Sequence, residues 1–102
     1  MQFMITAYDG TDEGAFARRM NARPRHLENI VKVKESGRVV CAGGLLDDAG
    51  KMIGSFLIME FATKELFDAY LATEPYVTEK VWQDTKVEIC NAVIMNDELV
   101  GK

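Results

Sequence analysis

Residue types that build metal and disulfide sites are scarce in this sequence. Its 102 residues include one histidine and two cysteines. A structural zinc site needs about four clustered histidine, cysteine or carboxylate ligands, so we expect no metal site. Cys41 and Cys90 fall inside predicted strands, which is typical of reduced thiols in the core of a cytoplasmic protein.

Long hydrophobic runs and clusters of positive charge are also missing. No apolar segment approaches the ~20 residues of a membrane span. The chain enters a strand pattern directly at Met1, without the basic and apolar regions of a signal peptide. Its 12 Lys and Arg residues are outnumbered by 16 Asp and Glu residues, giving a net charge of -4. We therefore expect a cytoplasmic protein whose main partner is neither a membrane nor a nucleic acid.

The remaining composition is that of an ordinary globular domain. Hydrophobic residues make up 48% of the chain and charged residues 27%, and the length fits one domain. We therefore treat residues 1–102 as a single domain, with residues 96–102 as a polar, frayed tail.

Hydrophobic periodicity predicts the element order β-α-β-β-α-β. The expected strands cover residues 2–9, 38–46, 52–61 and 85–95, and the expected helices cover residues 13–36 and 64–73, with a short helical turn at 77–81. This order predicts an α+β, ferredoxin-like fold: a four-stranded antiparallel sheet with both helices on one face.

The first helix is expected to bury an apolar stripe and to be interrupted by a proline. The stripe with helical spacing consists of Phe16, Met20, Leu27, Ile30 and Val31. A proline inside a helix removes a hydrogen bond and costs about 3 kcal/mol. Pro24 therefore predicts either a kink or two helices, the second opening at Pro24.

Apolar residues occupy both faces of the last two predicted strands. In the third strand, Leu57 and Met59 alternate with Phe56 and Ile58. Monomers rarely leave an apolar patch of several hundred Å² uncovered. We therefore predict a homodimer through the open sheet face, and the alternative is a monomer with mixed patterning.

The lone histidine, His26, is the first candidate for acid–base chemistry, because histidine titrates near neutral pH. The alternative is a helix histidine without a role. A general base also needs an orienting carboxylate, and the candidates are Glu74, Asp47, Asp48 and Glu60. Glu74 stands out because Pro75 disfavours a helical backbone there, although it could equally be a solvated helix-end carboxylate.

Other residues offer contacts to a ligand of the same site. Arg23 lies on the same side of the helix as His26, and Tyr76 and Ser55 carry hydroxyls. The pair Gly43-Gly44 within a strand indicates a bulge or the close approach of a ligand or backbone. Ser55 could instead be a small residue tolerated beside a glycine.

Taken together, these segments resemble the YCII-like family of small dimeric α/β-barrel proteins. The resemblance covers nearly the whole chain and rests on Arg23-x-x-His26-Leu27, Gly43-Gly44, Gly54-Ser55 and Glu74-Pro75-Tyr76-Val77. It implies a ferredoxin-like fold that dimerises through its sheets. It also implies an active site with a His–Asp pair, which matches His26 and Glu74. Here the acidic residue is glutamate, which moves the carboxylate by one methylene.

Two functions are compatible with these residues. In the first, His26 and Glu74 abstract a proton from a small cyclic or aromatic compound, as in the lyase-like activity that the resemblance implies, without a cofactor. Arg23 or Tyr76 would steady the developing oxyanion. In the second, a small-molecule binding or accessory module uses the same pocket without turnover. RNA binding on the sheet is excluded because the strands lack a set of stacking aromatic residues and the protein is acidic.

Overall fold

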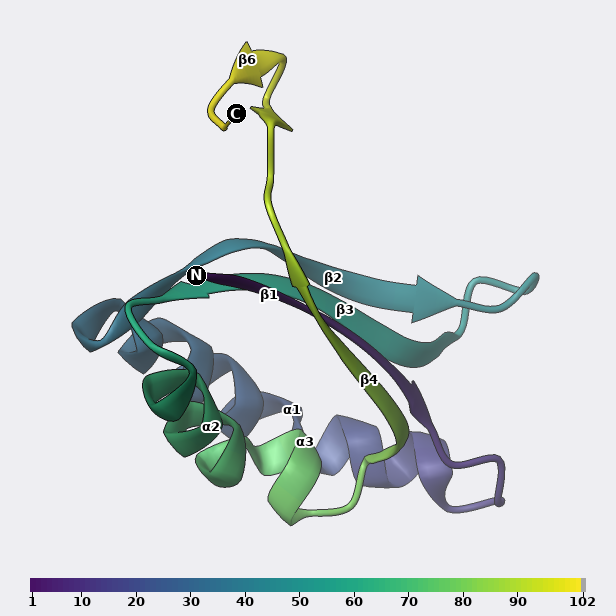
Figure 1. The fold of residues 1–102 in the computed structure, drawn as a ribbon. Helices are drawn as coiled ribbons and strands as arrows, with labels where there is room; N and C mark the ends of the chain where they lie inside the picture. Colours follow the sequence, from purple (N-terminus) through teal and green to yellow (C-terminus); the bar gives the residue numbers. More distant parts are fainter. Residues whose placement is uncertain (102) are drawn as a thin grey trace.

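The computed structural model describes residues 1–101 and places three helices on one face of a four-stranded sheet (Figure 1). The elements are β1 (Gln2–Asp9), α1 (Ala15–Lys32), a 3-10 turn (Val33–Glu35), β2 (Gly37–Leu46), β3 (Met52–Phe61), α2 (Lys64–Thr73), α3 (Pro75–Thr78) and β4 (Trp82–Cys90). The sheet order is β2-β3-β1-β4, with every neighbouring pair antiparallel. This arrangement confirms the predicted ferredoxin-like fold.

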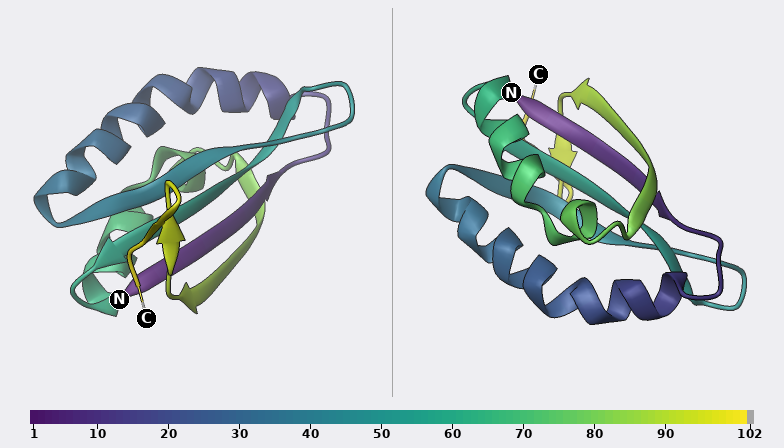
Figure 2. Two further views of the ribbon diagram at one scale, coloured as in Figure 1. Left: turned by 90° about the horizontal axis from the view of Figure 1, so that it is seen from above. Right: turned by 90° about the horizontal axis from the view of Figure 1, so that it is seen from below.

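The core lies between the sheet and the helices. Alternate side chains of β1 and β3 point toward the helices and are buried: Phe3, Ile5, Ala7, Leu57, Met59 and Phe61. Phe67 of α2 stacks on Phe3, with ring centroids 4.2 Å apart. Figure 2 shows, from below, α1 along one side of this layer with α2 and α3 beside it.

The buried face of α1 differs from the predicted one. Four residues at helical spacing are buried: Ala15, Arg19, Ala22 and His26. Most of the expected stripe is exposed instead, including Phe16, Met20, Leu27 and Val31, whereas Ile30 packs against the core. The helix can turn these polar residues inward because Arg19 and His26 each meet a buried carboxylate outside α1.

Pro24 does not divide the first helix as expected. Residues 15–32 form one α-helix with Pro24 inside it. Pro24 lies on the exposed side, so the carbonyl that loses its hydrogen bond there can be solvated by water. A 3-10 turn then replaces the last turn of the expected helix.

The open face of the sheet is apolar on β3 but not on β4. Phe56 and Ile58 lie on this face of β3, where Phe56 is 37% exposed. On β4 the same face carries Lys86 and Glu88, which pair with Thr6 and Met4 of β1. The expectation of an apolar fourth strand on both faces is therefore wrong.

The cysteines and the last part of the chain also depart from expectation. Cys41 is exposed rather than part of the core, and Cys90 is half-buried at the end of β4. The expected strand 85–95 begins at Trp82 and ends at Cys90, and the expected turn 77–81 is the earlier helix α3. The segment 96–102, expected to be frayed, contributes to a hairpin of β5 (Ile94–Met95) and β6 (Glu98–Leu99); Lys102 lies outside the described residues.

Gly54 is required where β3 passes close to β1. A Cβ at this position would collide with the backbone carbonyl oxygen of Ala7. We expect Gly54→Ala to lower the free energy of unfolding by about 1–3 kcal/mol in urea denaturation, the usual cost of overpacking. Gly14→Ala is the control, because a Cβ there meets Asp12 at 3.4 Å, ordinary contact. Equal stability of the two variants would contradict this account.

Candidate active site

Glu74 lies at the junction of two helices, in a backbone conformation set by the next residue. Its φ of -65° and ψ of 119° are extended, as expected for a residue before proline. It therefore ends α2 and begins α3, where Pro75 occupies the first helical turn. This junction directs the Glu74 side chain inward, and the residue is completely buried.

Three donors surround the Glu74 carboxylate. His26 contacts Oε1 through Nδ1, and the backbone N–H of Tyr76 donates to the same oxygen at 3.1 Å. The Tyr70 hydroxyl donates to Oε2 at 2.5 Å. Burial, followed by the charge of Glu74, raises the pKa of Tyr70 far above its ordinary value, so Tyr70 stays a donor. A buried carboxylate is thus fully hydrogen-bonded by the protein.

This arrangement fixes both the plane and the tautomer of His26. Its ring stacks on the Tyr76 ring with centroids 3.8 Å apart and planes 7° apart. Because a carboxylate only accepts hydrogen bonds, Nδ1 carries the proton that meets Glu74. The neutral ring therefore keeps its lone pair on Nε2, which is left for a molecule beside the histidine.

A small cavity adjoins His26 between α1 and the sheet. Its volume is about 210 Å³, below the range of ~300–1,000 Å³ typical for drug-sized ligands, so it suits a compound of single-ring size. Polar groups come from Arg19, Arg23, His26, Ser55 and Tyr76, and apolar walls come from Leu27, Ile30, Ala42, Met52 and Leu57. Gly43 and Gly44 complete the lining.

The predicted site residues therefore converge on one place. Arg23, His26, Gly43, Gly44, Ser55 and Tyr76 line the cavity, and Glu74 lies behind the histidine. The other candidate carboxylates lie elsewhere. Asp47 accepts the backbone N–H groups of Ala49 and Lys51 in the β2–β3 turn, and Glu60 pairs with Arg38. Asp48 belongs to the same turn as Asp47 and does not line the cavity.

The hydroxyl of Ser55 is oriented by two donors. Its Oγ accepts from Arg19 Nη2 at 2.8 Å and from Trp82 Nε1 at 3.1 Å. A hydroxyl oxygen has two lone pairs, so both are occupied and its hydrogen remains to be donated. Ser55 can thus donate to an oxygen in the cavity but is poorly placed to act as a nucleophile.

Arg19 itself is held by a buried ion pair. Its guanidinium contacts both carboxylate oxygens of Asp9, at 3.0 and 3.1 Å, and both side chains are almost completely buried. Burial raises the pKa of Asp9, and the positive charge of Arg19 opposes that shift. Asp9 thus balances the charge of Arg19, whereas Arg23, the other arginine of the cavity, has no salt bridge to any side chain within residues 1–101.

The Tyr76 hydroxyl is buried, and its hydrogen meets no acceptor within residues 1–101. Burial raises the pKa of Tyr76, while Arg19 and Arg23 oppose the shift. The hydroxyl therefore keeps its proton at neutral pH. Because buried hydroxyls are normally hydrogen-bonded, a ligand oxygen in this cavity would supply the missing acceptor.

Gly43 and Gly44 shape the cavity in different ways. A Cβ on Gly43 would lie 2.6 Å from the ring of Phe56 on the open face, so this glycine is needed for packing outside the cavity. A Cβ on Gly44 would meet Met52 at 3.3 Å, which is a close but adjustable contact. The two glycines let bare backbone form one wall of the cavity.

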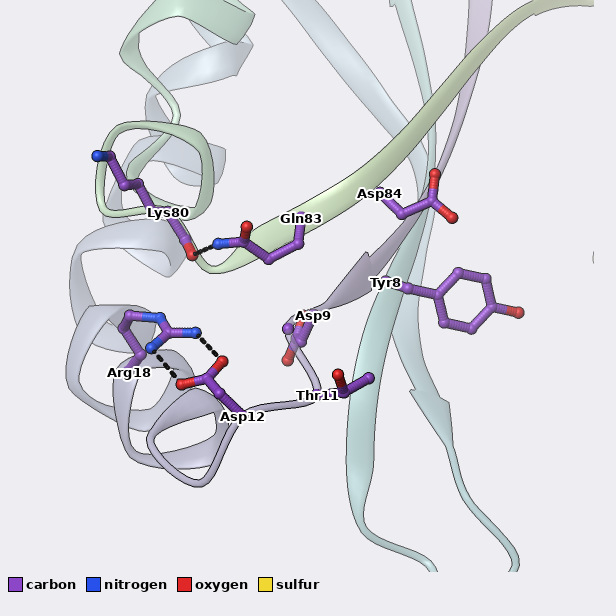
Figure 3. A pocket seen from close by; sticks show the side chains of 9 residues that line it. Tyr8, Asp9, Thr11, Asp12, Arg18, Lys80, Gln83 and Asp84 are labelled. Atoms are coloured by element: carbon purple, nitrogen blue, oxygen red, sulfur yellow. Dashed lines mark hydrogen bonds and ion pairs between the residues drawn. The ribbon is translucent and has the colours of Figure 1, made fainter.

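A larger, more open groove lies at the end of β1 (Figure 3). Its volume is about 710 Å³. Within it, Arg18 pairs with both oxygens of Asp12 and holds the pKa of that carboxyl at about 2. Gln83 donates to the Lys80 backbone carbonyl at 2.5 Å. No histidine, cysteine or serine lines this groove, so it offers no acid–base pair comparable to His26 and Glu74.

Across residues 1–101, no group of three or more histidine, cysteine or carboxylate side chains is arranged to hold a metal ion. No helix within the same residues combines the length and apolar character needed to cross a membrane.

The sequence analysis missed Tyr70, Asp9 and Trp82 as neighbours of the site. Tyr70 lies four residues before Glu74 at the end of α2, and this helical spacing could have indicated the contact. Asp9 and Trp82 come from β1 and β4, and only the sheet register brings them beside Arg19 and Ser55. No local pattern in the sequence signals that arrangement.

Comparisons with known proteins agree with this fold. The YCII-related domain family matches residues 1–91. The protein YciI of Escherichia coli O6:H1 (strain CFT073) is 30% identical over 94 residues, which is 86% of this chain and 94% of the relative. The YciI protein of Shigella flexneri matches to the same extent.

Two solved structures are similar. The first is 5-chloro-2-hydroxyhydroquinone dehydrochlorinase of Burkholderia phenoliruptrix AC1100, in complex with 2,5-dihydroxybenzoquinone. It is 25% identical with a TM-score of 0.73, covering 88% of this chain and 93% of that one. The second is a dimeric ferredoxin-like protein from Jannaschia sp., 16% identical with a TM-score of 0.54, covering 85% and 94%. At that identity the second similarity concerns the fold alone.

The contribution of the Glu74 carboxylate to stability can be tested by replacing one of its oxygens with an NH2 group. In Glu74→Gln, the amide NH2 faces a donor in place of a carboxylate oxygen. We expect the free energy of unfolding to fall by about 1–3 kcal/mol, the cost of a buried polar group left unpaired. Urea denaturation measures the change. Glu65→Gln, at an exposed position of α2, should stay within about 0.5 kcal/mol of the parent, and an equal loss in both would contradict a special role for Glu74.

Proposed function

The chain belongs to the YCII-related family, and we propose that it is a small-molecule enzyme in which His26 and Glu74 abstract a proton from a small cyclic or aromatic compound. One observation carries the proposal: the only histidine lines a cavity through its ring while a buried glutamate holds its Nδ1. That is the arrangement a general base requires.

His26 Nε2 would take the proton from the substrate. The imidazolium formed in this step is balanced by Glu74, which already accepts the Nδ1–H. Tyr70 and the Tyr76 backbone keep Glu74 in place during the transfer. Because these groups are preorganised and largely shielded from water, little reorganisation is needed when charge develops.

The other cavity residues would bind the oxygen that becomes negative. Arg23 provides a positive charge, Ser55 a hydroxyl with only its hydrogen free, and Tyr76 a buried hydroxyl whose hydrogen meets no acceptor among residues 1–101. All three are donors. This set favours a ring that carries hydroxyl or carbonyl oxygens, and the apolar walls contact its faces.

The products follow from where the electron pair goes. If the carbon next to the deprotonated centre carries a leaving group, the C–H pair forms a double bond, the leaving group departs with its own pair, and the net change is loss of HX. Without a leaving group, His26 can return the proton to another carbon, which is an isomerisation. Neither route changes the oxidation state of the protein. The similarity to a dehydrochlorinase of a hydroxylated ring supports the first route.

Solvent deuterium exchange tests the base independently of the leaving group. A panel of hydroxylated and chlorinated single-ring compounds is incubated with the protein in D2O, and NMR follows both exchange at carbon and release of chloride. We expect His26→Ala to lower the rate by about 10²–10⁴-fold, the usual contribution of general base catalysis. Unchanged rates in His26→Ala would remove His26 from the mechanism.

Arg25 provides a matched control for Arg23 in the same assay. Arg25 lies two residues further along α1, is exposed and pairs with Glu79. Arg23→Gln should therefore lower the rates of exchange and chloride release, while Arg25→Gln should leave them unchanged. If ligands bind to the parent protein but neither exchange nor chloride release occurs, the alternative holds: a binding or accessory module that uses the same pocket.

The proposal includes a homodimer through the open sheet face. Phe56 is 37% exposed on that face, and Tyr8 beside it on β1 is 46% exposed. A second copy would remove both from water, and the match to a dimeric ferredoxin-like protein supports this geometry at the level of fold. The unpaired thiols Cys41 and Cys90 support a reducing compartment such as the cytoplasm.

Phe56 and Val77 form a matched pair for testing the dimer. Their exposed fractions are 37% and 38%, but Phe56 lies on the open face and Val77 on α3, across the sheet. We expect Phe56→Glu to convert the dimer to a monomer in sedimentation velocity, because a charge would be buried unpaired. Val77→Glu should remain dimeric. A dimeric Phe56→Glu variant would place the interface elsewhere.

A further inference from the structure

The end of the chain forms an arm that stands away from its own sheet. After β4 the chain leaves the sheet on the face opposite the helices and ends in the β5–β6 hairpin (Figure 1). Seen from above, the hairpin projects over the open face (Figure 2). We call residues 92–101 the arm. Its apolar side chains are among the most exposed of the described residues: Ile94 at 68%, Leu99 at 77% and Val100 at 48%.

The shape of the arm is encoded in its sequence. Asn96 and Asp97 both adopt positive φ, 52° and 64°, which is the conformation of a two-residue hairpin turn. The N–H groups of Val100 and Gly101 donate to the Val93 carbonyl at 2.7 and 3.1 Å. A Cβ on Gly101 would collide with the Ala92 carbonyl oxygen. The arm is therefore a closed loop with a specific glycine and a specific turn.

The base of the arm is fixed to the open face. The Ala92 N–H donates to Gln2 Oε1 at 2.6 Å, and Gln2 Nε2 donates to Glu60 Oε1 at 3.0 Å. Glu60 in turn pairs with Arg38 of β2. This chain of hydrogen bonds crosses from β1 through β3 to β2, so the direction in which the arm leaves the sheet is set by the rest of the sheet.

A hairpin with two-residue strands cannot be stable alone. Isolated two-stranded hairpins are marginal in water, and this one exposes the side chains that would have to stabilise it. We infer that the arm docks on a second copy of this chain, against the partner's open sheet face. The inference rests on the proposed sheet-to-sheet dimer and adds a contact to it.

The position of the arm favours a second copy over other partners. The arm rises from the same face that carries the exposed Phe56 and Tyr8. When two copies pack with these faces together about a two-fold axis, each arm necessarily points toward the other copy. Both arms then make the same contact, as in any isologous interface, and the exposed Ile94 and Leu99 meet an apolar surface.

A charge-substitution pair tests the inference by equilibrium sedimentation. We expect Ile94→Lys/Leu99→Lys to weaken the dimer by about tenfold or more, because two apolar side chains per copy lose their burial. Val31→Lys/Leu66→Lys is the control, since both residues are exposed on helices across the sheet, and should not change dimerisation. Equal dimer stability in the parent, the arm variant and the control overturns the inference. If Phe56→Glu dissociates the dimer but the arm variant does not, the sheet interface is retained and the arm contact is rejected.

Intermolecular paramagnetic broadening locates the arm directly. A nitroxide is attached at Leu99→Cys in a Cys41→Ser/Cys90→Ser background. This protein is mixed with wild type that is ¹⁵N-enriched and carries no nitroxide. We expect broadening of the Phe56 and Ile58 amide signals in the ¹⁵N copy. A label at Val31→Cys in the same background is the control and should not broaden them. Absence of broadening in the ¹⁵N copy overturns the inference, as does a wild type that is monomeric throughout.

Discussion

The Glu74 carboxylate is the group on which the arrangement of the helices depends. A fully buried carboxylate is stable only when the protein supplies its hydrogen bonds, and here they come from Tyr70 on α2, the Tyr76 backbone on α3 and His26 on α1. Three helices are thus tied to one pair of oxygen atoms. The same contacts that make the residue tolerable inside the protein hold the histidine in one tautomer.

A second buried carboxylate, that of Asp9, holds the N-terminal part of α1 in place. Asp9 at the end of β1 pairs with Arg19, which reaches Ser55 on β3. The helix therefore lies on the sheet through two hydrogen-bonded polar anchors, Arg19 and His26, seven residues or about two turns apart. Its position is specified by directional bonds, and the exposed apolar side chains Phe16 and Leu27 are a consequence of this orientation.

How far the sequence predicts the structure depends on whether a signal is local. The alternation of the first three strands and the extended backbone of Glu74 before Pro75 are local signals, and they appear as expected. The buried face of α1 does not follow from a local signal. Apolar periodicity assigns Leu27 to the core, whereas Glu74, 48 residues after His26, and Asp9 on β1 draw the polar face inward. The hairpin of the arm was missed because its strands, Ile94–Met95 and Glu98–Leu99, are only two residues long and show no periodicity.

Gly43 has close neighbours on both faces of the sheet, and this limits how the cavity can be engineered. It lines the cavity on one face and lies beneath the Phe56 ring on the other. Any side chain added there to reshape the pocket would push Phe56 out of the open face. Variant libraries that reshape the cavity should therefore leave position 43 as glycine. They can vary Leu27, Ala42 and Met52, which also line the cavity. The cavity wall can therefore change at positions 27, 42 and 52, whereas position 43 is constrained from both faces of the sheet.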